Sequence, residues 1–118
     1  MLPKTDVGFE NLKISEFQKM MRHIYFHSDS RRGVRGTYDW FVDEVEELGE
    51  ALEGDDKGAL EKEFADVLAW LASLANVADI DLEKSAISKY DCKCPKCGQS
   101  PCQCPFRMNS LSVSGPSQ

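Results

Sequence analysis

The run Phe-Ala-Asp-Val-Leu-Ala-Trp-Leu-Ala-Ser-Leu-Ala at residues 64–75 constrains the fold more than any other part of the chain. Wound as a helix at about 100° per residue, it is apolar on nearly every side and must be largely buried. A chain of 118 residues with roughly 75 helical residues cannot cover such a helix by itself. Because a monomer would expose a large apolar patch, the sequence predicts a homodimer or a higher homo-oligomer in which helices pair across the interface.

Helical periodicity extends over most of the chain and strand patterns are absent, so the predicted fold class is all-α with four helices. The first is expected to open at Ser15, in a capping box formed by Ser15-Glu16-Phe17-Gln18. A Gly/Arg-rich loop over residues 28–36 follows, and Thr37 is the expected N-cap of the second helix. We expect the remaining helices over residues 37–53, 58–78 and 82–90, the last capped by Asp81.

The chain divides into four segments by composition. Residues 1–13 show no periodicity and are expected to form a flexible arm, and residues 14–90 form the helical domain. Residues 91–105 hold all the cysteines. Residues 106–118 are rich in serine, with Gly and Pro, and are expected to be a disordered tail.

Two pairs of carboxylates, Glu44/Glu47 and Glu63/Asp66, are each spaced i,i+3 on helices that carry apolar, core-facing residues. Residues three apart share a helix face, so each pair points the same way. Burying unpaired carboxylates is costly, and four that converge need a cation. An all-oxygen donor set favours Mg²⁺ or Mn²⁺. Four other acids of the second helix lie on its opposite, solvated side: Asp43, Glu46, Glu50 and Glu53.

Each pair also has an ordinary structural interpretation. In that interpretation Glu44 and Glu47 extend the solvated acidic face, and Asp66 forms a buried salt bridge with Arg31, Arg32 or Arg35. These three arginines are separated by glycines just before the carboxylate helix, and arginine suits bidentate phosphate binding. The alternative for them is a solvent-exposed basic loop.

Four further side chains have both a functional and a structural interpretation. Trp40 and Trp70 have the spacing of core residues, although either ring could stack on a base. His23 and His27 are spaced i,i+4, as metal ligands often are, but no acid or cysteine lies at a matching position. We therefore expect both histidines to have a structural or surface role.

Five cysteines lie between residues 92 and 104, an odd number that fits a disulfide framework badly. Cys94-Pro95-Lys96-Cys97-Gly98 has the form of a zinc knuckle, and Cys102 and Cys104 would complete a tetrahedral structural Zn²⁺ site. Cys92 is then the spare thiol, or replaces Cys94. The alternative is a redox pair at Cys94 and Cys97, but the strand and helix expected around such a pair are missing.

The net charge of −6 argues against general binding to nucleic acid or to anionic membranes. No apolar run is long enough for a membrane span, and the N-terminal residues lack the apolar core of a signal peptide. We expect a cytoplasmic protein, a setting in which clustered cysteines are more often metal ligands than disulfides.

Glu44-x-x-Glu47-Leu48, followed 15 residues on by Glu63-x-x-Asp66, resembles the signature of the MazG-type nucleoside triphosphate pyrophosphohydrolases. The resemblance covers about residues 15–90. Asp43 stands where the family often has the first Glu of its Glu-Glu-x-x-Glu-Leu core, and this position lies on the solvated face.

The resemblance implies an all-α, four-helix protomer that forms helical bundles by dimerisation and cleaves nucleoside triphosphates between the α- and β-phosphates with Mg²⁺. On that analogy the four carboxylates are catalytic metal ligands, and a lysine of the terminal helix, best matched by Lys89, binds substrate. The competing class of function is a non-catalytic helical dimer that binds a partner through its zinc knot.

Overall fold

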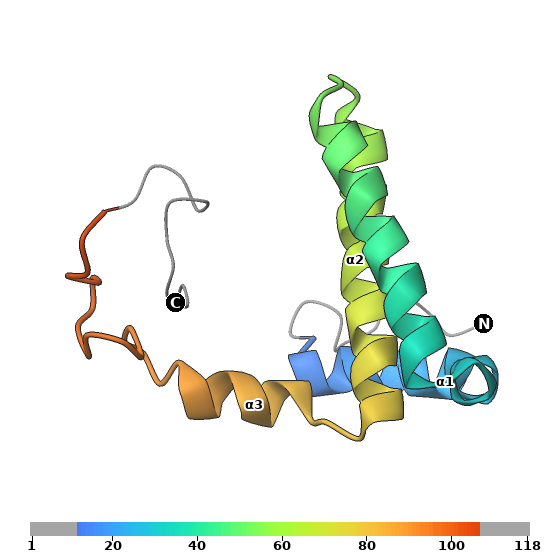
Figure 1. The fold of residues 1–118 in the computed structure, drawn as a ribbon, viewed down its shortest axis with the longest axis horizontal. Helices are drawn as coiled ribbons and strands as arrows, with labels where there is room; N and C mark the ends of the chain where they lie inside the picture. The colour runs from blue at the N-terminus through green and yellow to red at the C-terminus, as the bar shows by residue number, and fades with distance from the viewer. Residues whose placement is uncertain (1–11, 107–118) are drawn as a thin grey trace. The chain divides into compact units, whose positions relative to one another are not determined.

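A computed structural model describes residues 12–106 and shows three helices and no strand among them (Figure 1). These are α1 (Ile14–Leu52), α2 (Lys57–Ala78) and α3 (Leu82–Lys89). The predicted all-α class is confirmed. Most of the predicted N-terminal arm and nearly all of the predicted tail lie outside the described residues.

The predicted loop over residues 28–36 is wrong, because these residues belong to α1. Only Gly33 leaves the helical region there, with φ 80° and ψ 177°, a conformation open to glycine because it has no Cβ. The helix therefore bends at this residue into two arms, which run in clearly different directions in Figure 1. Gly36 stays helical, and a Cβ there would lie 2.8 Å from Cγ of Arg32, so this glycine leaves room for the arginine stem.

Both predicted caps of the first two helices are also wrong. Helix α1 begins one residue before Ser15, and the backbone N–H of Lys13 donates to Oε1 of Glu16 at 3.0 Å. Thr37 is fully buried inside the second arm of α1, because the helical backbone resumes directly after Gly33. Cap residues are found where backbone N–H groups lack intrahelical partners, and the bend leaves such a position at Gly33 rather than four residues later.

The ends of α2 follow the local sequence. Asp56 is its N-cap, and its side chain accepts a hydrogen bond from the N–H of Ala59 at 3.1 Å. Asp79 ends the helix in the left-handed region with φ 61°, where its short polar side chain is tolerated. Helix α3 then begins at Leu82, directly after Asp81, as predicted.

Helices α1 and α2 pack against each other over most of the length of α2, and small side chains form much of the buried surface. The buried residues of α2 are all small or polar: Ala72, Ser73, Ala75 and Asn76. Of the large apolar side chains in the described chain, only Met21 is buried, and it is 7% exposed. The expectation that residues 64–75 are covered on all sides is therefore not met within one chain, where Phe64 and Leu68 remain about half exposed.

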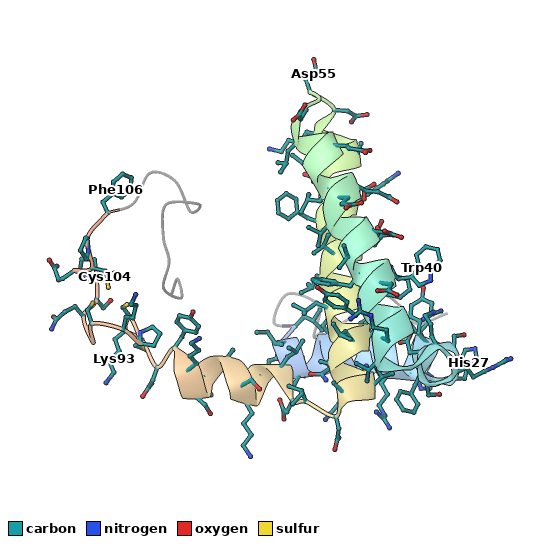
Figure 2. All side chains as sticks on the ribbon, viewed as in Figure 1. His27, Trp40, Asp55, Lys93, Cys104 and Phe106 are labelled. Carbon is teal, nitrogen blue, oxygen red and sulfur yellow. The ribbon has the colours of Figure 1, made fainter. Side chains whose placement is uncertain are left out.

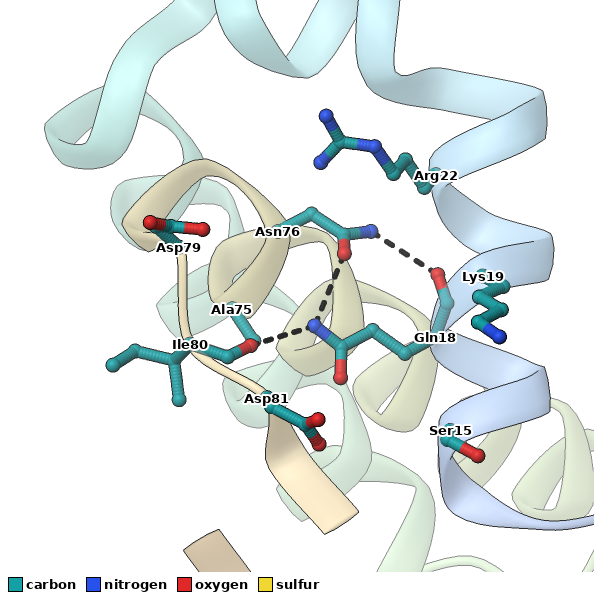
Figure 3. Close-up of a pocket in the computed structure, with 9 residues that line it drawn as sticks. All are labelled: Ser15, Gln18, Lys19, Arg22, Ala75, Asn76, Asp79, Ile80 and Asp81. Carbon is teal, nitrogen blue, oxygen red and sulfur yellow. Dashed lines mark hydrogen bonds between the residues drawn. The ribbon is translucent and has the colours of Figure 1, made fainter. Parts of the chain in front are cut away.

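Gln18 holds the start of α1 against the end of α2 (Figure 3). Its Nε2 donates to Oδ1 of Asn76 at 3.0 Å and to the carbonyl oxygen of Ile80 at 2.7 Å. Its Oε1 accepts from the N–H of Leu82 at 2.9 Å, and the Asn76 amide donates back to the Gln18 carbonyl at 3.2 Å. The buried side-chain amide of Gln18 thus provides hydrogen-bond partners for backbone groups of the turn that leads into α3.

The chain forms two compact units, residues 1–83 and residues 84–118. The first holds α1, α2 and the start of α3, and the second holds the rest of α3 and the cysteine-rich segment. None of the described helices combines the length and the apolar character needed to cross a membrane.

Candidate active site and cysteine cluster

Glu44 on α1 and Glu63 and Asp66 on α2 bring their carboxylates together. Each offers one oxygen, and the three oxygens lie within 4.8 Å of one another. Because Glu63 and Asp66 are one helical turn apart and face the second arm of α1, the antiparallel packing of the two helices creates the cluster.

The carboxylates of this cluster are partly buried and repel one another. Burial raises the pKa of Glu44, and the charges of Glu47, Asp66 and Glu63 raise it further. Burial likewise raises the pKa of Glu63, with additional contributions from Glu47 and Asp66. Each raised pKa means that the folded chain disfavours the ionised form of that carboxyl group.

Two oxygens of the cluster are buried without a partner. Oε1 of Glu44 and Oε1 of Glu63 have no hydrogen-bond donor among residues 12–106. An unpaired buried carboxylate oxygen is costly, and a divalent cation would supply what is missing. The donor set, carboxylate oxygens alone, fits a hard cation such as Mg²⁺ or Mn²⁺.

The fourth predicted carboxylate, Glu47, is not one of the three whose oxygens converge. It lies close enough for its charge to raise the pKa of both Glu44 and Glu63. Asp66 is exposed within one chain rather than buried as its apolar neighbours suggested. The described residues show no salt bridge between Asp66 and any of Arg31, Arg32 and Arg35.

The arginines have different surroundings. Arg32 donates from Nη1 to Oδ1 of Asp29 at 2.8 Å, and its guanidinium carbon lies 5.0 Å from the ring centroid of Trp70. Arg35 pairs with Asp39 at 3.4 Å on the surface, and Arg31 is exposed. Arg32 is therefore held between Asp29 of α1 and Trp70 of α2.

The two tryptophans stack on each other across the helix pair. Their ring centroids are 5.7 Å apart and their planes differ by 13°. Trp40 is labelled in Figure 2 and belongs to the second arm of α1. Trp70 is held by this stack and by Arg32, while Trp40 is half exposed. His23 and His27 are exposed on the first arm of α1, which agrees with a surface role.

A pocket of about 290 Å³ adjoins the carboxylate cluster and includes Asp66 in its wall. Its α1 residues have i, i+3, i+4, i+7 spacing, and so have its α2 residues, so one helical face of each element forms the two walls. The sequence analysis gives no role to Asp29, a residue of this pocket, because it predicts a loop over residues 28–36. The i,i+3 pairing of Asp29 with Arg32 was the available signal.

The cysteine-rich segment brings together the four predicted sulfurs, those of Cys94, Cys97, Cys102 and Cys104, all within 4.8 Å of one another. The Cys94–Cys104 and Cys97–Cys102 Sγ distances are both 3.9 Å. Zn–S bonds of about 2.3 Å in a tetrahedron separate the sulfurs by about 3.8 Å. Cys92 lies outside the group.

Backbone N–H groups point at these sulfurs. The N–H of Lys96 donates to Sγ of Cys94 at 3.4 Å, and Gly98 makes the turn with φ 74°. The N–H groups of Gln103 and Gln99 lower the pKa of Cys97 to about 6. Such donors stabilise thiolates, the form in which cysteine binds metals.

The described chain is thus an all-α protein with carboxylates from two helices gathered beside a pocket. The model of the MazG nucleotide pyrophosphohydrolase domain matches residues 33–98, more than half of the chain, and the protein belongs to this family. The match begins at the bend of α1, includes all four predicted carboxylates, and ends within the cysteine-rich segment. Among curated proteins, no match is found.

Proposed function

We propose that this protein hydrolyses nucleoside triphosphates, with Mg²⁺ or Mn²⁺, to a nucleoside monophosphate and pyrophosphate. A water molecule attacks the α-phosphorus, the bond from this phosphorus to the α,β-bridging oxygen breaks, and pyrophosphate leaves. The observation that carries the proposal is the convergence of Glu44, Glu63 and Asp66 in a chain of the MazG family.

The carboxylates would hold the cation, with Glu47 as the fourth member of the site. When bound, the ion would screen the substrate charge, polarise the phosphoryl groups and acidify a water molecule. The unpartnered oxygens of Glu44 and Glu63 support this role, because a triphosphate cannot approach them without a cation between. One of the carboxylates accepts the proton of the attacking water.

The basic residues would bind the substrate phosphates. Arg32 is oriented by Asp29 and lies at the pocket that includes Asp66, so it is the strongest candidate. Arg31 and Arg35 are exposed and could reach phosphate from the surface of the bend. Lys89 belongs to the second compact unit, and its assignment to the site rests on the family resemblance alone.

We propose that the active protein is a homodimer or a larger homo-oligomer. Phe64, Leu68 and Leu71 follow one face of α2 and are each more than a third exposed. Val45 and Leu52 are similarly exposed on the second arm of α1. A second copy that covers these side chains would supply the core that one chain lacks.

We also propose that Cys94, Cys97, Cys102 and Cys104 bind one structural Zn²⁺. The sulfur spacing and the N–H groups that point at the sulfurs support this assignment. Four protein ligands close the coordination sphere, so this ion would stabilise the segment without taking part in hydrolysis.

The decisive experiment is to incubate the full chain with a panel of ribo- and deoxyribonucleoside triphosphates and Mg²⁺. Monophosphate and pyrophosphate should appear together, and Glu63→Gln should lower turnover at least about 100-fold. Glu46→Gln is the matched control, since Glu46 is exposed in the same acidic run. Release of orthophosphate, no release at all, or full activity in Glu63→Gln would refute the proposal.

A further inference from the structure

The pocket beside the carboxylate cluster holds a buried acceptor with no donor. Asp29 has a side chain that is 2% exposed, and its Oδ1 is taken by Arg32. Its Oδ2 is buried and has no hydrogen-bond partner among the described residues. Asp29 and Arg32 both lie before residue 33, where the match to the family model begins.

The α2 wall of the pocket begins at the carboxylate cluster. Asp66, Trp70 and Ser73 follow one another along α2, and the first and last are about 10 Å apart along the helix axis. On α2, Trp70 is covered by Arg32, and Asn76, further toward the C-terminus of α2, binds Gln18. Asp29 contributes to the opposite wall, from the first arm of α1.

The chemistry of the walls suits a flat, polar-edged ring. Tyr25 and Trp70 supply aromatic surface, and Trp70 is fixed by its stack on Trp40 and by Arg32. A substrate whose phosphates lie at the carboxylate cluster would place its base in this pocket, where Asp29 forms part of the wall. The exocyclic amino groups of cytosine and adenine lie on the base edge farthest from the sugar, and they are N–H donors.

We infer that this pocket receives the nucleobase of the substrate and that Oδ2 of Asp29 accepts a hydrogen bond from its exocyclic amino group. The inference rests on the proposed hydrolysis and adds a substrate class to it, the amino-bearing bases. A keto oxygen at the same place would meet a buried carboxylate oxygen, and an unpaired acceptor of this kind is penalised strongly.

The test compares kcat/KM for two matched pairs, CTP against UTP and ATP against ITP, with the full chain and Mg²⁺. The wild-type protein should prefer the amino member of at least one pair by roughly 10- to 100-fold. In Asp29→Asn the preference should disappear or reverse. Arg32 has only donors, so it keeps the Asn oxygen, and the Asn NH₂ then faces the pocket and favours a keto group.

Asp55→Asn is the matched control, because Asp55 is exposed in the connection between α1 and α2 and should leave both ratios unchanged. Equal rates within both pairs in the wild-type protein would overturn the inference while hydrolysis itself still stands. An unaltered preference in folded Asp29→Asn would also overturn it. Failure of every triphosphate to react would instead refute the proposed function, so the two failures are distinguishable. The wild-type ratios decide the question even if the variant does not fold.

Discussion

Replacing Gln18 by alanine tests whether the buried amide, rather than the small apolar core, joins the two ends of the helical unit. The change removes three hydrogen bonds, those to Asn76, Ile80 and Leu82. At about 1 kcal/mol each, their loss should destabilise the protein by about 3 kcal/mol. For a unit of this size the melting temperature should then fall by about 12–24 °C.

A second substitution tests the polarity of the same contacts. Gln18→Glu keeps the shape of the side chain and the oxygen that accepts from the N–H of Leu82. It replaces Nε2, which donates to the carbonyl oxygen of Ile80 at 2.7 Å, by a carboxylate oxygen that would face this carbonyl. Asn76 can rotate its amide to compensate, whereas a backbone carbonyl cannot. We therefore expect Gln18→Glu to be at least as destabilising as Gln18→Ala at neutral pH.

Thermal unfolding followed by circular dichroism, at one fixed protein concentration, measures both effects. Lys19→Ala is the control, because Lys19 is exposed one residue away on the same helix. If Gln18→Ala melted within about 2 °C of Lys19→Ala, a shift that corresponds to less than about 0.5 kcal/mol, the amide network would not be what holds the helix ends together.

Three further predictions concern charge, metal and assembly. Because the pKa values of Glu44 and Glu63 are raised above the ordinary 4.5, the folded protein binds more protons than the unfolded chain and loses stability as pH rises from about 4.5 through the raised values. Glu63→Gln should flatten this pH profile and reduce the rise in melting temperature caused by Mg²⁺; an undiminished Mg²⁺ effect would contradict the cluster as the cation site. Protein purified under reducing conditions should contain one zinc ion per chain by elemental analysis. The zinc should be retained in Cys92→Ser and lost in Cys97→Ser. A wild-type protein free of zinc would rule out the site. Leu68→Lys should lower the solution mass measured by light scattering, since this exposed side chain lies on the face proposed to be covered, and an unchanged mass would place the interface elsewhere.

Much of the local structure was predictable from the sequence. The 3.6-residue period assigned the all-α class and nearly the whole extent of α2, because helix periodicity depends only on neighbours along the chain. The grouping of Cys94, Cys97, Cys102 and Cys104 was also predictable, since the short spacings between these cysteines keep their sulfurs close together. In both cases the deciding interactions are close in sequence.

The bend of α1 was not predictable in the same way. Two glycines and three arginines suggested a loop, yet only Gly33 breaks the helix, while Gly36 remains helical beside the Arg32 stem. Whether a glycine interrupts a helix or is tolerated within it depends on how the segments on either side of it pack. Here α2 holds both arms of α1, and that contact is long-range.

The family signature and the i,i+3 carboxylate pairs could be recognised from the sequence because each is a local pattern on one helix. Tertiary structure alone decided that Glu44, Glu63 and Asp66 converge while Glu47 stands beside them. It also turned Asp29 from an apparent loop residue into a buried acceptor in the pocket next to the cluster. Helical spacing determines which side chains share a face, but only the packing of one helix against another determines which faces meet.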